Sequence, residues 1–147
     1  MAVQMSPDPT GPAGSDRPAT GAQVELALSV ADDLLVLARL TVSAVASRAG
    51  FDIEEIEDLR LAVDELCLQV LEGRRSGRLV LAMATEPGCI DIWCRYEGTD
   101  EARPDGPDDE GDLSERILDA LVDEHGPFVA DGRPGARLTK RRAPAGG

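Results

Sequence analysis

Asp58-Leu-Arg-Leu-Ala-Val-Asp-Glu-Leu-Cys-Leu-Gln-Val-Leu-Glu-Gly73 is the stretch that decides the fold of this chain. Its apolar residues recur at steps of three and four, which places them on one face of a helix. These residues are Leu59, Ala62, Val63, Leu66, Val70 and Leu71. Glu65 and Gln69 are separated by one helical turn, so both side chains project from the same flank. The stretch predicts a core helix with a polar pair, which either addresses a ligand or a metal or forms a solvated edge.

Periodicity on both sides of this helix predicts further strands and helices. We expect strands at 23–30, 78–85, 89–96, 128–130 and 136–140, and helices at 32–48, 54–72 and 112–124. The apolar stripe of the third helix consists of Leu113, Ile117, Leu118, Leu121 and Val122. The two middle strands are apolar on both faces, so their hairpin lies centrally in a sheet. The predicted fold class is α/β, an α+β sandwich whose helices cover one face of a mixed, mainly antiparallel sheet.

The chain of 147 residues is long enough for one domain, which we place at 23–142. Residues 1–22 are rich in small residues and proline and hold too few large apolar side chains to form a core, so we expect a disordered arm. We expect a disordered tail at 143–147. The segment 97–111 is polar and strongly acidic, and a loop of this length is either a functional lid or disordered.

The charge balance indicates protein partners. Lys and Arg number 15 against 28 Asp and Glu, and the net charge of −13 repels a nucleic-acid backbone. Aromatic residues make up 3% of the chain, too few for the usual stacking platforms of single strands. A solvated acidic surface without a partner is the alternative. No apolar run is long enough to cross a bilayer and no secretory signal pattern is present, so the sequence predicts a cytoplasmic protein without membrane contact.

The cysteines and the single histidine give little support for a metal site. His125 alone disfavours most metal centres and a Ser-His-Asp triad. Cys89 and Cys94 stand at odd spacing on one expected strand, so they face opposite sides and cannot hold one ion together. Cys67 stands alone on the central helix. Redox regulation through these three thiols is one hypothesis, and small apolar residues in a reducing compartment are the other.

Four segments resemble one known family. They are Ala38-Arg-Leu-Thr-Val-Ser-Ala-Val-Ala-Ser-Arg48, Glu55-Ile-Glu-Asp-Leu-Arg-Leu-Ala-Val-Asp-Glu65, Ala120-Leu-Val-Asp-Glu124 and Gly135-Ala-Arg-Leu-Thr-Lys-Arg141. Together they resemble the anti-sigma-factor serine/threonine kinases (RsbW-like) of the histidine-kinase-like ATPase superfamily (GHKL), which has the Bergerat fold. The likeness extends from Val24 to Arg142, and its most specific part is the central helix.

The resemblance implies partners. Members of the family bind an alternative sigma factor of the stress or sporulation type, and an anti-sigma-factor antagonist of the STAS type controls its release. They use ATP to phosphorylate a serine of that antagonist, and they form homodimers. The resemblance places the sigma-binding surface around the first helix, where Arg39 and Arg48 are candidate exposed contacts. Alternatively, both arginines only solvate the helix.

The first nucleotide motif of the family is only partly kept. In the family's Glu-x-x-x-Asn, the glutamate acts as a base or orients a water, and the asparagine holds Mg²⁺. Glu65 matches the glutamate, as a candidate catalytic residue, whereas Gln69 replaces the asparagine. Glutamine places its amide oxygen one methylene further out, and Mg²⁺ requires near-ideal octahedral geometry, so Gln69 is a poor metal ligand. The alternative for Glu65 is a carboxylate kept for helix stability.

The remaining nucleotide motifs have changed further. The family's Asp-x-Gly-x-Gly, whose aspartate binds the adenine, aligns with Tyr96-Glu-Gly-Thr-Asp100, so that Gly98 alone is kept. Asp105-Gly106 is the alternative, a displaced copy of the motif. The family's Gly-x-Gly-Leu aligns with Asp112-Leu-Ser-Glu115, where Ser114 replaces a glycine and two carboxylates oppose a triphosphate. A threonine of the last strand appears as Ala136.

These substitutions favour one function over another. The leading hypothesis is an anti-sigma factor that binds its sigma factor and has lost, or nearly lost, ATP binding and kinase activity, with no cofactor. The alternative is an active serine/threonine kinase that uses ATP and Mg²⁺ at Glu65, Gln69, Gly98 and Ser114. Function resides in the site and not in the scaffold, so the fold is compatible with both.

Overall fold

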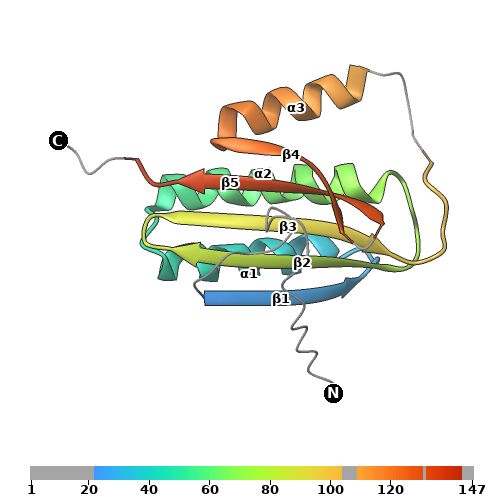
Figure 1. Ribbon diagram of the computed structural model, residues 1–147, viewed down its shortest axis with the longest axis horizontal. Helices are drawn as coiled ribbons and strands as arrows, with labels where there is room; N and C mark the ends of the chain where they lie inside the picture. The colour runs from blue at the N-terminus through green and yellow to red at the C-terminus, as the bar shows by residue number, and fades with distance from the viewer. Residues whose placement is uncertain (1–21, 104–108, 131, 144–147) are drawn as a thin grey trace.

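The computed structural model describes residues 22–103, 109–130 and 132–143 (Figure 1). The elements are β1 (Ala22–Ser29), α1 (Leu34–Arg48), α2 (Ile53–Leu71), β2 (Arg78–Glu86), β3 (Cys89–Glu97), α3 (Asp109–Leu121), β4 (Glu124–Ala130) and β5 (Arg133–Arg141). The predicted arm at 1–22, apart from its last residue, lies outside the described residues. So do the centre of the acidic loop, which includes Asp105-Gly106, and residues 144–147 of the tail.

The strands form one sheet in the order β1-β2-β3-β5-β4, and every neighbouring pair within the described residues is antiparallel. The expectation of a mixed sheet was therefore wrong. Two helices connect β1 to β2, and after them β2 runs opposite to β1. The single helix α3 leaves β4 running in the same direction as β3, but β5 lies between them, so no parallel pair forms. The central place of the β2-β3 hairpin is confirmed.

The helix α2 organises the core, as its periodicity predicted. It packs against α1, α3 and the sheet, and α1 and α2 cover the same face of that sheet (Figure 1). Leu59, Ala62, Val63 and Leu66 expose none of their area, and burial of one leucine side chain contributes roughly 1.5–3 kcal/mol. The Asp52 side chain accepts the Glu55 amide at 2.8 Å and the Glu55 carboxylate accepts the Asp52 amide at 2.9 Å, which closes the N-terminus in a capping box.

The third helix differs from its prediction at both ends. It runs from Asp109 to Leu121 and not from 112 to 124, and Glu124 already opens β4. The chain leaves the helix there because the Asp123 amide donates to the Thr139 carbonyl at 3.0 Å and Glu124 pairs with Thr139. Within the predicted apolar stripe, Leu118 is fully buried, whereas Leu113 is 57% exposed and is not a core residue.

The last hairpin is longer than predicted. β4 and β5 pair from Glu124 opposite Thr139 to Ala130 opposite Arg133, and the connection between them includes Gly132 with a φ of 76°. The predicted turn at 131–135 was too long, because Pro134 and Gly135 belong to β5.

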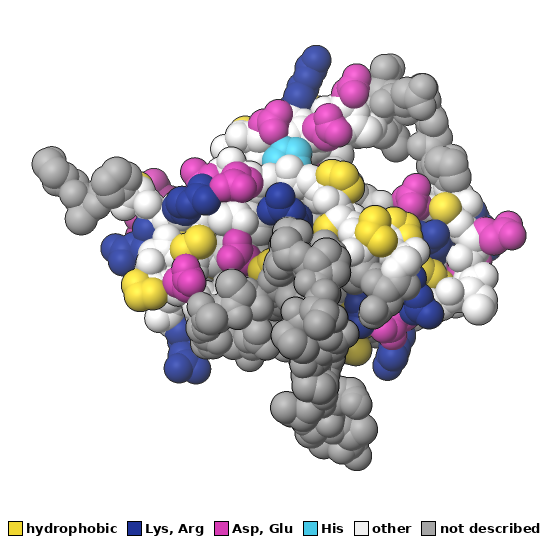
Figure 2. All heavy atoms as spheres, viewed as in Figure 1, with side chains coloured by type: hydrophobic (Ala, Val, Ile, Leu, Met, Phe, Trp, Pro, Cys, Tyr) yellow, Lys and Arg dark blue, Asp and Glu magenta, His cyan; other side chains and the backbone are white. Residues whose placement is uncertain are grey.

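Among the described helices, none is both long and apolar enough to span a membrane. Figure 2 shows acidic side chains gathered on α3 at the upper edge of the molecule. Of these, Asp112, Glu115 and Asp119 are exposed.

Candidate functional site

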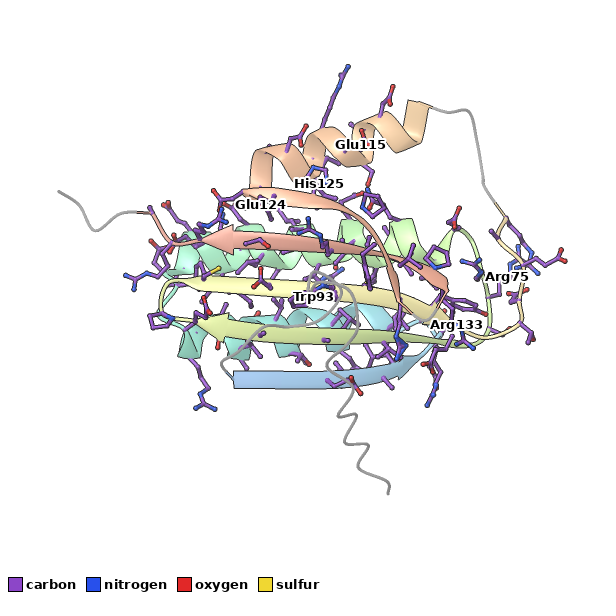
Figure 3. All side chains as sticks on the ribbon, in the orientation of Figure 1. Arg75, Trp93, Glu115, Glu124, His125 and Arg133 are labelled. Atoms are coloured by element: carbon purple, nitrogen blue, oxygen red, sulfur yellow. The ribbon has the colours of Figure 1, made fainter. Side chains whose placement is uncertain are left out.

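A cavity of about 510 Å³ lies where the C-terminal half of α2, the segment after β3, and strands β4 and β5 meet. Its lining includes Gln69 and Gly98, and it includes Ala136, at the place of the family's threonine. Three positions that lie far apart in the sequence therefore surround one space. Glu115 on α3, His125 on β4 and Arg133 at the β4-β5 hairpin also line the cavity, and Figure 3 labels all three.

Glu65 and Ser114 lie next to this cavity but are not among its lining residues. Ser114 Oγ on α3 donates to Glu65 Oε2 at 2.9 Å, and Gln69 Nε2 donates to Ser114 Oγ at 2.8 Å. Ser114 is 9% exposed, and both α2 side chains are half-buried. The polar pair on α2 is thus neither a free ligand-binding pair nor a solvated edge, because the serine of α3 connects its two members.

Tyr96 occupies the position at which the resemblance expected an adenine-binding aspartate. Its hydroxyl donates to the Ser76 carbonyl at 2.8 Å, and the Arg74 guanidinium lies 4.4 Å from the centre of its ring. The ring is buried, and a Cβ atom at Gly98 would collide with the tyrosine hydroxyl. Gly98 is therefore required for packing against Tyr96, whatever its part in binding a ligand.

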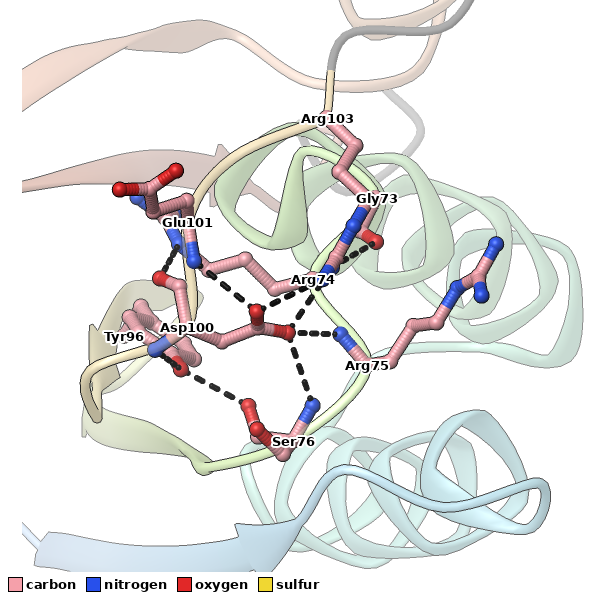
Figure 4. A network of polar contacts seen from close by, with 8 residues as sticks. All are labelled: Gly73, Arg74, Arg75, Ser76, Tyr96, Asp100, Glu101 and Arg103. Carbon is pink, nitrogen blue, oxygen red and sulfur yellow. Dashed lines mark hydrogen bonds and ion pairs between the residues drawn. The ribbon is translucent and has the colours of Figure 1, made fainter.

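Asp100 fastens the start of the acidic loop to the turn between α2 and β2 (Figure 4). Its carboxylate accepts the Arg75 amide at 2.7 Å and both terminal nitrogens of Arg103 at 3.0 Å. The Arg103 amide in turn donates to the Glu72 carbonyl at 2.6 Å. The bonds from the Arg103 side chain and the hydrogen bond from the Arg75 backbone amide hold the pKa of Asp100 well below its ordinary value of 3.8. The described beginning of the loop, up to Arg103, is thus fixed at the mouth of the cavity.

Charges of both signs line the cavity. Arg74 donates to the carbonyls of Asp100 and Val70 at 3.2 and 3.0 Å, and it lies 3.7 Å from the Glu72 carboxylate. His125 Nε2 is 2.7 Å from Asp119 Oδ1. Of the two carboxylates expected to oppose a triphosphate, Glu115 lines the cavity and Asp112 does not. Sequence reasoning did not assign Arg74, His125 or Arg133 to the site, since no motif or periodicity connects them.

The arginines of α1 lie away from this cavity, and they differ from each other. Arg39 Nε contacts both oxygens of Asp64 on α2, at 2.8 and 3.0 Å, which raises the pKa of the guanidinium. Arg39 is thus half-exposed, and its charge is already paired within the chain. Arg48 is exposed in the last turn of α1, and no ion pair among the described residues includes it.

The cysteines occupy the places that their spacing predicted on β3. Cys94 points into the core, fully buried, while Cys89 is partly exposed. The Cys94 pKa is raised well above its ordinary value by a hydrogen bond with Cys67 and by burial, and burial also raises the Cys89 pKa. Raised pKa values suppress the thiolate, which is the reactive form. Among the described residues, no three His, Cys, Asp or Glu side chains are grouped as metal ligands.

Comparison with known proteins gives a consistent set of relatives, although no family model matches the chain. The anti-sigma-F factor RsbW of Mycobacterium tuberculosis is 30% identical over 146 residues, covering 89% of this chain and 83% of that protein. The serine-protein kinase RsbW of Bacillus licheniformis is 26% identical over 119 residues, covering 69% and 74%. The serine-protein kinase RsbW of Bacillus pumilus is 38% identical over 55 residues, covering 37% of this chain and 34% of that protein.

Proposed function

The chain belongs to the RsbW family of anti-sigma factors and serine-protein kinases, and on this premise we propose that it is an anti-sigma factor with little or no kinase activity. It sequesters an alternative sigma factor of the stress or sporulation type by direct protein contact. An anti-sigma-factor antagonist of the STAS type releases that sigma factor. The same proposal includes a Bergerat-type ATPase fold, a homodimer and a cytoplasmic location.

The observation that carries the loss of kinase activity is the position of Ser114. Its hydroxyl contacts Glu65 and Gln69 together, at 2.9 and 2.8 Å. These are the two side chains to which the resemblance assigned the base and the metal ligand. A base must reach the proton that it removes, and a metal ligand must present an oxygen. These bonds hold Glu65 by one carboxylate oxygen and Gln69 by its amide nitrogen, so both side chains are oriented toward α3, which supports a structural use of the pair.

The residues present do not fit a magnesium nucleotide. Mg²⁺ takes oxygen ligands at about 2.0–2.1 Å in a strict octahedron, and Gln69 directs its amide nitrogen to Ser114. Tyr96 replaces the carboxylate that would accept the adenine amino group, and Arg74 covers its ring. Glu115 adds negative charge to the cavity wall. The cavity therefore keeps a suitable size but lacks the matching chemistry.

Arg48 is the stronger of the two candidate contacts with the sigma factor. Its charge is exposed and is not part of a described ion pair, so a partner carboxylate can bind it without displacing an existing contact. Arg39 first has to leave Asp64. A contact at the rim of an interface mainly affects the association rate and its salt dependence.

Two measurements test the proposal. Co-expression with each alternative sigma factor of the source genome should recover one stable complex by affinity purification. Calorimetric titration of the purified protein with Mg-ATP should show no binding in the micromolar range. If no sigma factor is retained, the anti-sigma assignment fails. If Mg-ATP binds at micromolar concentration, the proposal that the nucleotide site is lost is wrong, whereas the proposal that the protein sequesters a sigma factor is unaffected.

A second candidate function is an active serine/threonine kinase that phosphorylates the antagonist. The observation in its favour is the cavity itself, which keeps about 510 Å³ beside Gln69 and Gly98. Transfer of labelled phosphate from ATP to a serine of the antagonist, lost in Glu65→Gln, supports this alternative. The matched control is Glu72→Gln, which also changes a carboxylate of the same segment but removes no contact with Ser114.

A further inference from the structure

The strand β1 forms one edge of the sheet, and its outer side has no neighbouring strand among the described residues (Figure 1). The Val30 amide donates to the Gly77 carbonyl at 2.9 Å, and the β1-β2 register continues from there along the whole strand without a bulge. In an antiparallel pair, residues whose N–H and C=O groups point to the partner strand alternate with residues whose groups point away. Every second residue of β1 therefore directs both backbone groups outward. These residues are Gln23, Glu25, Ala27 and Ser29.

The sequence of β1 does not block this edge. The strand contains neither proline nor glycine, and Glu25 is its single charged residue. The opposite edge of the sheet is different, because β4 contains Pro127 and α3 packs beside it. Natural sheets usually block a long, regular edge strand, since its free backbone groups pair with a strand of another chain. An edge left open along its whole length indicates that a second strand is its partner.

The flank of α1 next to this edge is apolar. Arg39 forms its ion pair with α2, so the opposite flank of α1 points away from α2 and toward the side of β1. Leu37, Thr41 and Ala44 lie on that flank, at helical steps of four and three. Leu37 is 41% exposed, and the neighbouring Leu40 is 62% exposed. Exposed leucines beside two small residues form a surface on which another helix can pack closely.

The charge distribution favours a second copy of this chain at this edge. The protein carries a net charge of −13 with 28 Asp and Glu residues, so two copies repel each other over much of their surfaces. The helix α1 contains no acidic residue, whereas α3 is rich in them. Two copies therefore meet less repulsion along α1 and β1 than along α3.

The spacing of the layers allows strand and helix contacts at the same time. The helix α1 contacts both β1 and β2, so its axis lies over the space between them, about 2.4 Å inside β1 at a strand spacing of about 4.8 Å. Antiparallel pairing of β1 with β1 of a second copy has a two-fold axis perpendicular to the sheet, which keeps both α1 helices on the same face. The two helix axes are then about 10 Å apart, and packed helices lie about 8–10 Å apart.

One register of this pairing satisfies every outward backbone group. Centred on Leu26, it places Glu25 opposite Ala27 of the partner subunit and Gln23 opposite Ser29 of the partner subunit. All four outward-facing residues then exchange hydrogen bonds with the second copy. The two glutamates are not directly opposed, which avoids a destabilising pair of like charges.

We infer that two copies of this chain join through β1 into one continuous antiparallel sheet, with Leu37 and Leu40 of each α1 packed against α1 of the partner subunit. The inference rests on the homodimer of the proposed function and names the surface that forms it. It does not depend on the binding of a sigma factor.

Substitutions in the full-length protein test this surface, with sedimentation equilibrium as the measurement. The parent protein should be a dimer. Ala27→Pro removes an outward N–H and leaves the β1-β2 hydrogen bonds in place, so it should be a monomer, whereas Ala27→Val keeps the N–H and should remain a dimer. Leu37→Glu should raise the dissociation constant by roughly tenfold or more. Leu61→Glu changes a similarly exposed leucine of α2 and should leave the dissociation constant unchanged.

Amide hydrogen exchange locates the contact on the strand. In the parent dimer the Glu25 and Ala27 amides should exchange slowly. In Leu37→Glu, at a concentration where it is a monomer, they should exchange as unpaired amides. The Leu26 and Leu28 amides point to β2 and should stay protected in both proteins. If Ala27→Pro has lost its circular dichroism, Leu37→Glu and the exchange rates decide alone.

Three results overturn the inference. The first is a parent protein that remains a monomer at high micromolar concentration. The second is a dimer whose Glu25 and Ala27 amides exchange freely, and the third is protection of these amides that persists in the monomer. Capture of a sigma factor is a separate outcome. A protein that captures one but fails these tests contradicts this inference and not the anti-sigma assignment, and a β1-linked dimer that captures none contradicts only that assignment.

Discussion

Ser114 and Glu65 join two helices through a single 2.9 Å hydrogen bond, with the serine hydroxyl as the donor and the carboxylate as the acceptor. The Ser114 hydroxyl oxygen also accepts a hydrogen bond from the Gln69 amide nitrogen, so one side chain of α3 bonds to two side chains of α2. The contact explains how the polar pair persists beside a packed face. It also gives the site a structural use that does not require a nucleotide.

Replacing Ser114 by alanine should therefore weaken the fold. The change leaves Glu65 and Gln69 half-buried without their common partner, which costs about 1–3 kcal/mol of unfolding free energy. Urea unfolding followed by circular dichroism measures the loss. Ser43→Ala is the matched control, because that hydroxyl only bonds to the carbonyl of its own helix at Arg39. Equal stabilities of the two variants would contradict the bridging role of Ser114.

The two arginines of α1 should respond differently to alanine substitution. Arg39→Ala removes a half-exposed ion pair with Asp64 and should lower the unfolding free energy slightly, whereas Arg48→Ala should leave it almost unchanged. For sigma-factor binding the order reverses, and Arg48→Ala should reduce the association rate more. Chemical unfolding and stopped-flow binding at two salt concentrations separate these effects. Asp64→Ala should reproduce the stability loss of Arg39→Ala, since each breaks the same pair.

Gly135 should not tolerate a side chain. A Cβ atom there would collide with the Cys94 carbonyl and with the ring of Phe128, so the strands or the ring have to move. We expect Gly135→Ala to lower the unfolding free energy by about 1–3 kcal/mol. Gly126→Ala on the neighbouring strand β4 is the control, because a Cβ atom there meets nothing within 4 Å. Thermal melting of both variants measures the difference. A similar drop in melting temperature for both variants would contradict the role of the Gly135 contacts.

The Asp100 contacts should make the protein sensitive to acid. The folded pKa of Asp100 lies below its ordinary value of 3.8, so its contribution is complete at neutral pH. As the pH falls toward and below 3.8, the unfolded chain takes up the proton first and stability decreases. The pKa values of Glu97 and Glu124 also lie below their ordinary value of 4.5, mainly because of hydrogen bonds from Arg78 and Arg141 respectively. Their contributions to stability are therefore also lost as the pH falls.

Asp100→Asn should therefore reduce the melting temperature at pH 7 and flatten its decline between pH 5 and pH 2, since roughly this interval brackets the lowered carboxyl groups. Glu101→Gln is the charge-matched control, because its side chain takes no part in the described ion pairs. A melting temperature that falls with pH as steeply in Asp100→Asn as in the parent protein would argue against this source of acid sensitivity.

The three thiols should differ in reactivity. In the native protein at pH 7.5, iodoacetamide should modify Cys89 slowly and leave Cys67 and Cys94 unmodified, because both are fully buried. In denaturant all three should react. Intact-mass spectrometry counts the modified sites, and peptide mapping identifies them. Rapid native modification of Cys94 would show that the core opens around it, and would revive the redox hypothesis.

Sequence reasoning succeeded where one pattern decided the structure. The heptad-like spacing from Leu59 to Leu71 placed α2 within one residue at each end, and alternation placed β2 and β3. It overextended α3 because Leu121 and Val122 continue a helical stripe, while the hydrogen bonds that end the helix come from Thr139 on β5. Strand direction depended on the insertion of β5 next to β3, which no local signal contains.

The candidate site was harder to predict for a related reason. The motif comparison marked Glu65, Gln69, Gly98 and Ser114 as altered positions, and the structure brings Gln69 and Gly98 to one cavity. That Ser114 bonds to both members of the polar pair depends on the docking of α3, which is a tertiary property. The ion pair of Arg39 with Asp64 was not predicted, because the two residues lie on different helices.

The packing around Tyr96 limits how this protein can change over generations. Backbone at Gly77 and at Gly98 closes on the phenol so tightly that a Cβ atom at either glycine would collide with the hydroxyl. An aspartate at position 96 would leave the volume of the ring unfilled and Arg74 without its aromatic partner. A carboxylate at position 96 would therefore give up the packing that now joins the end of β3 to the turn before β2.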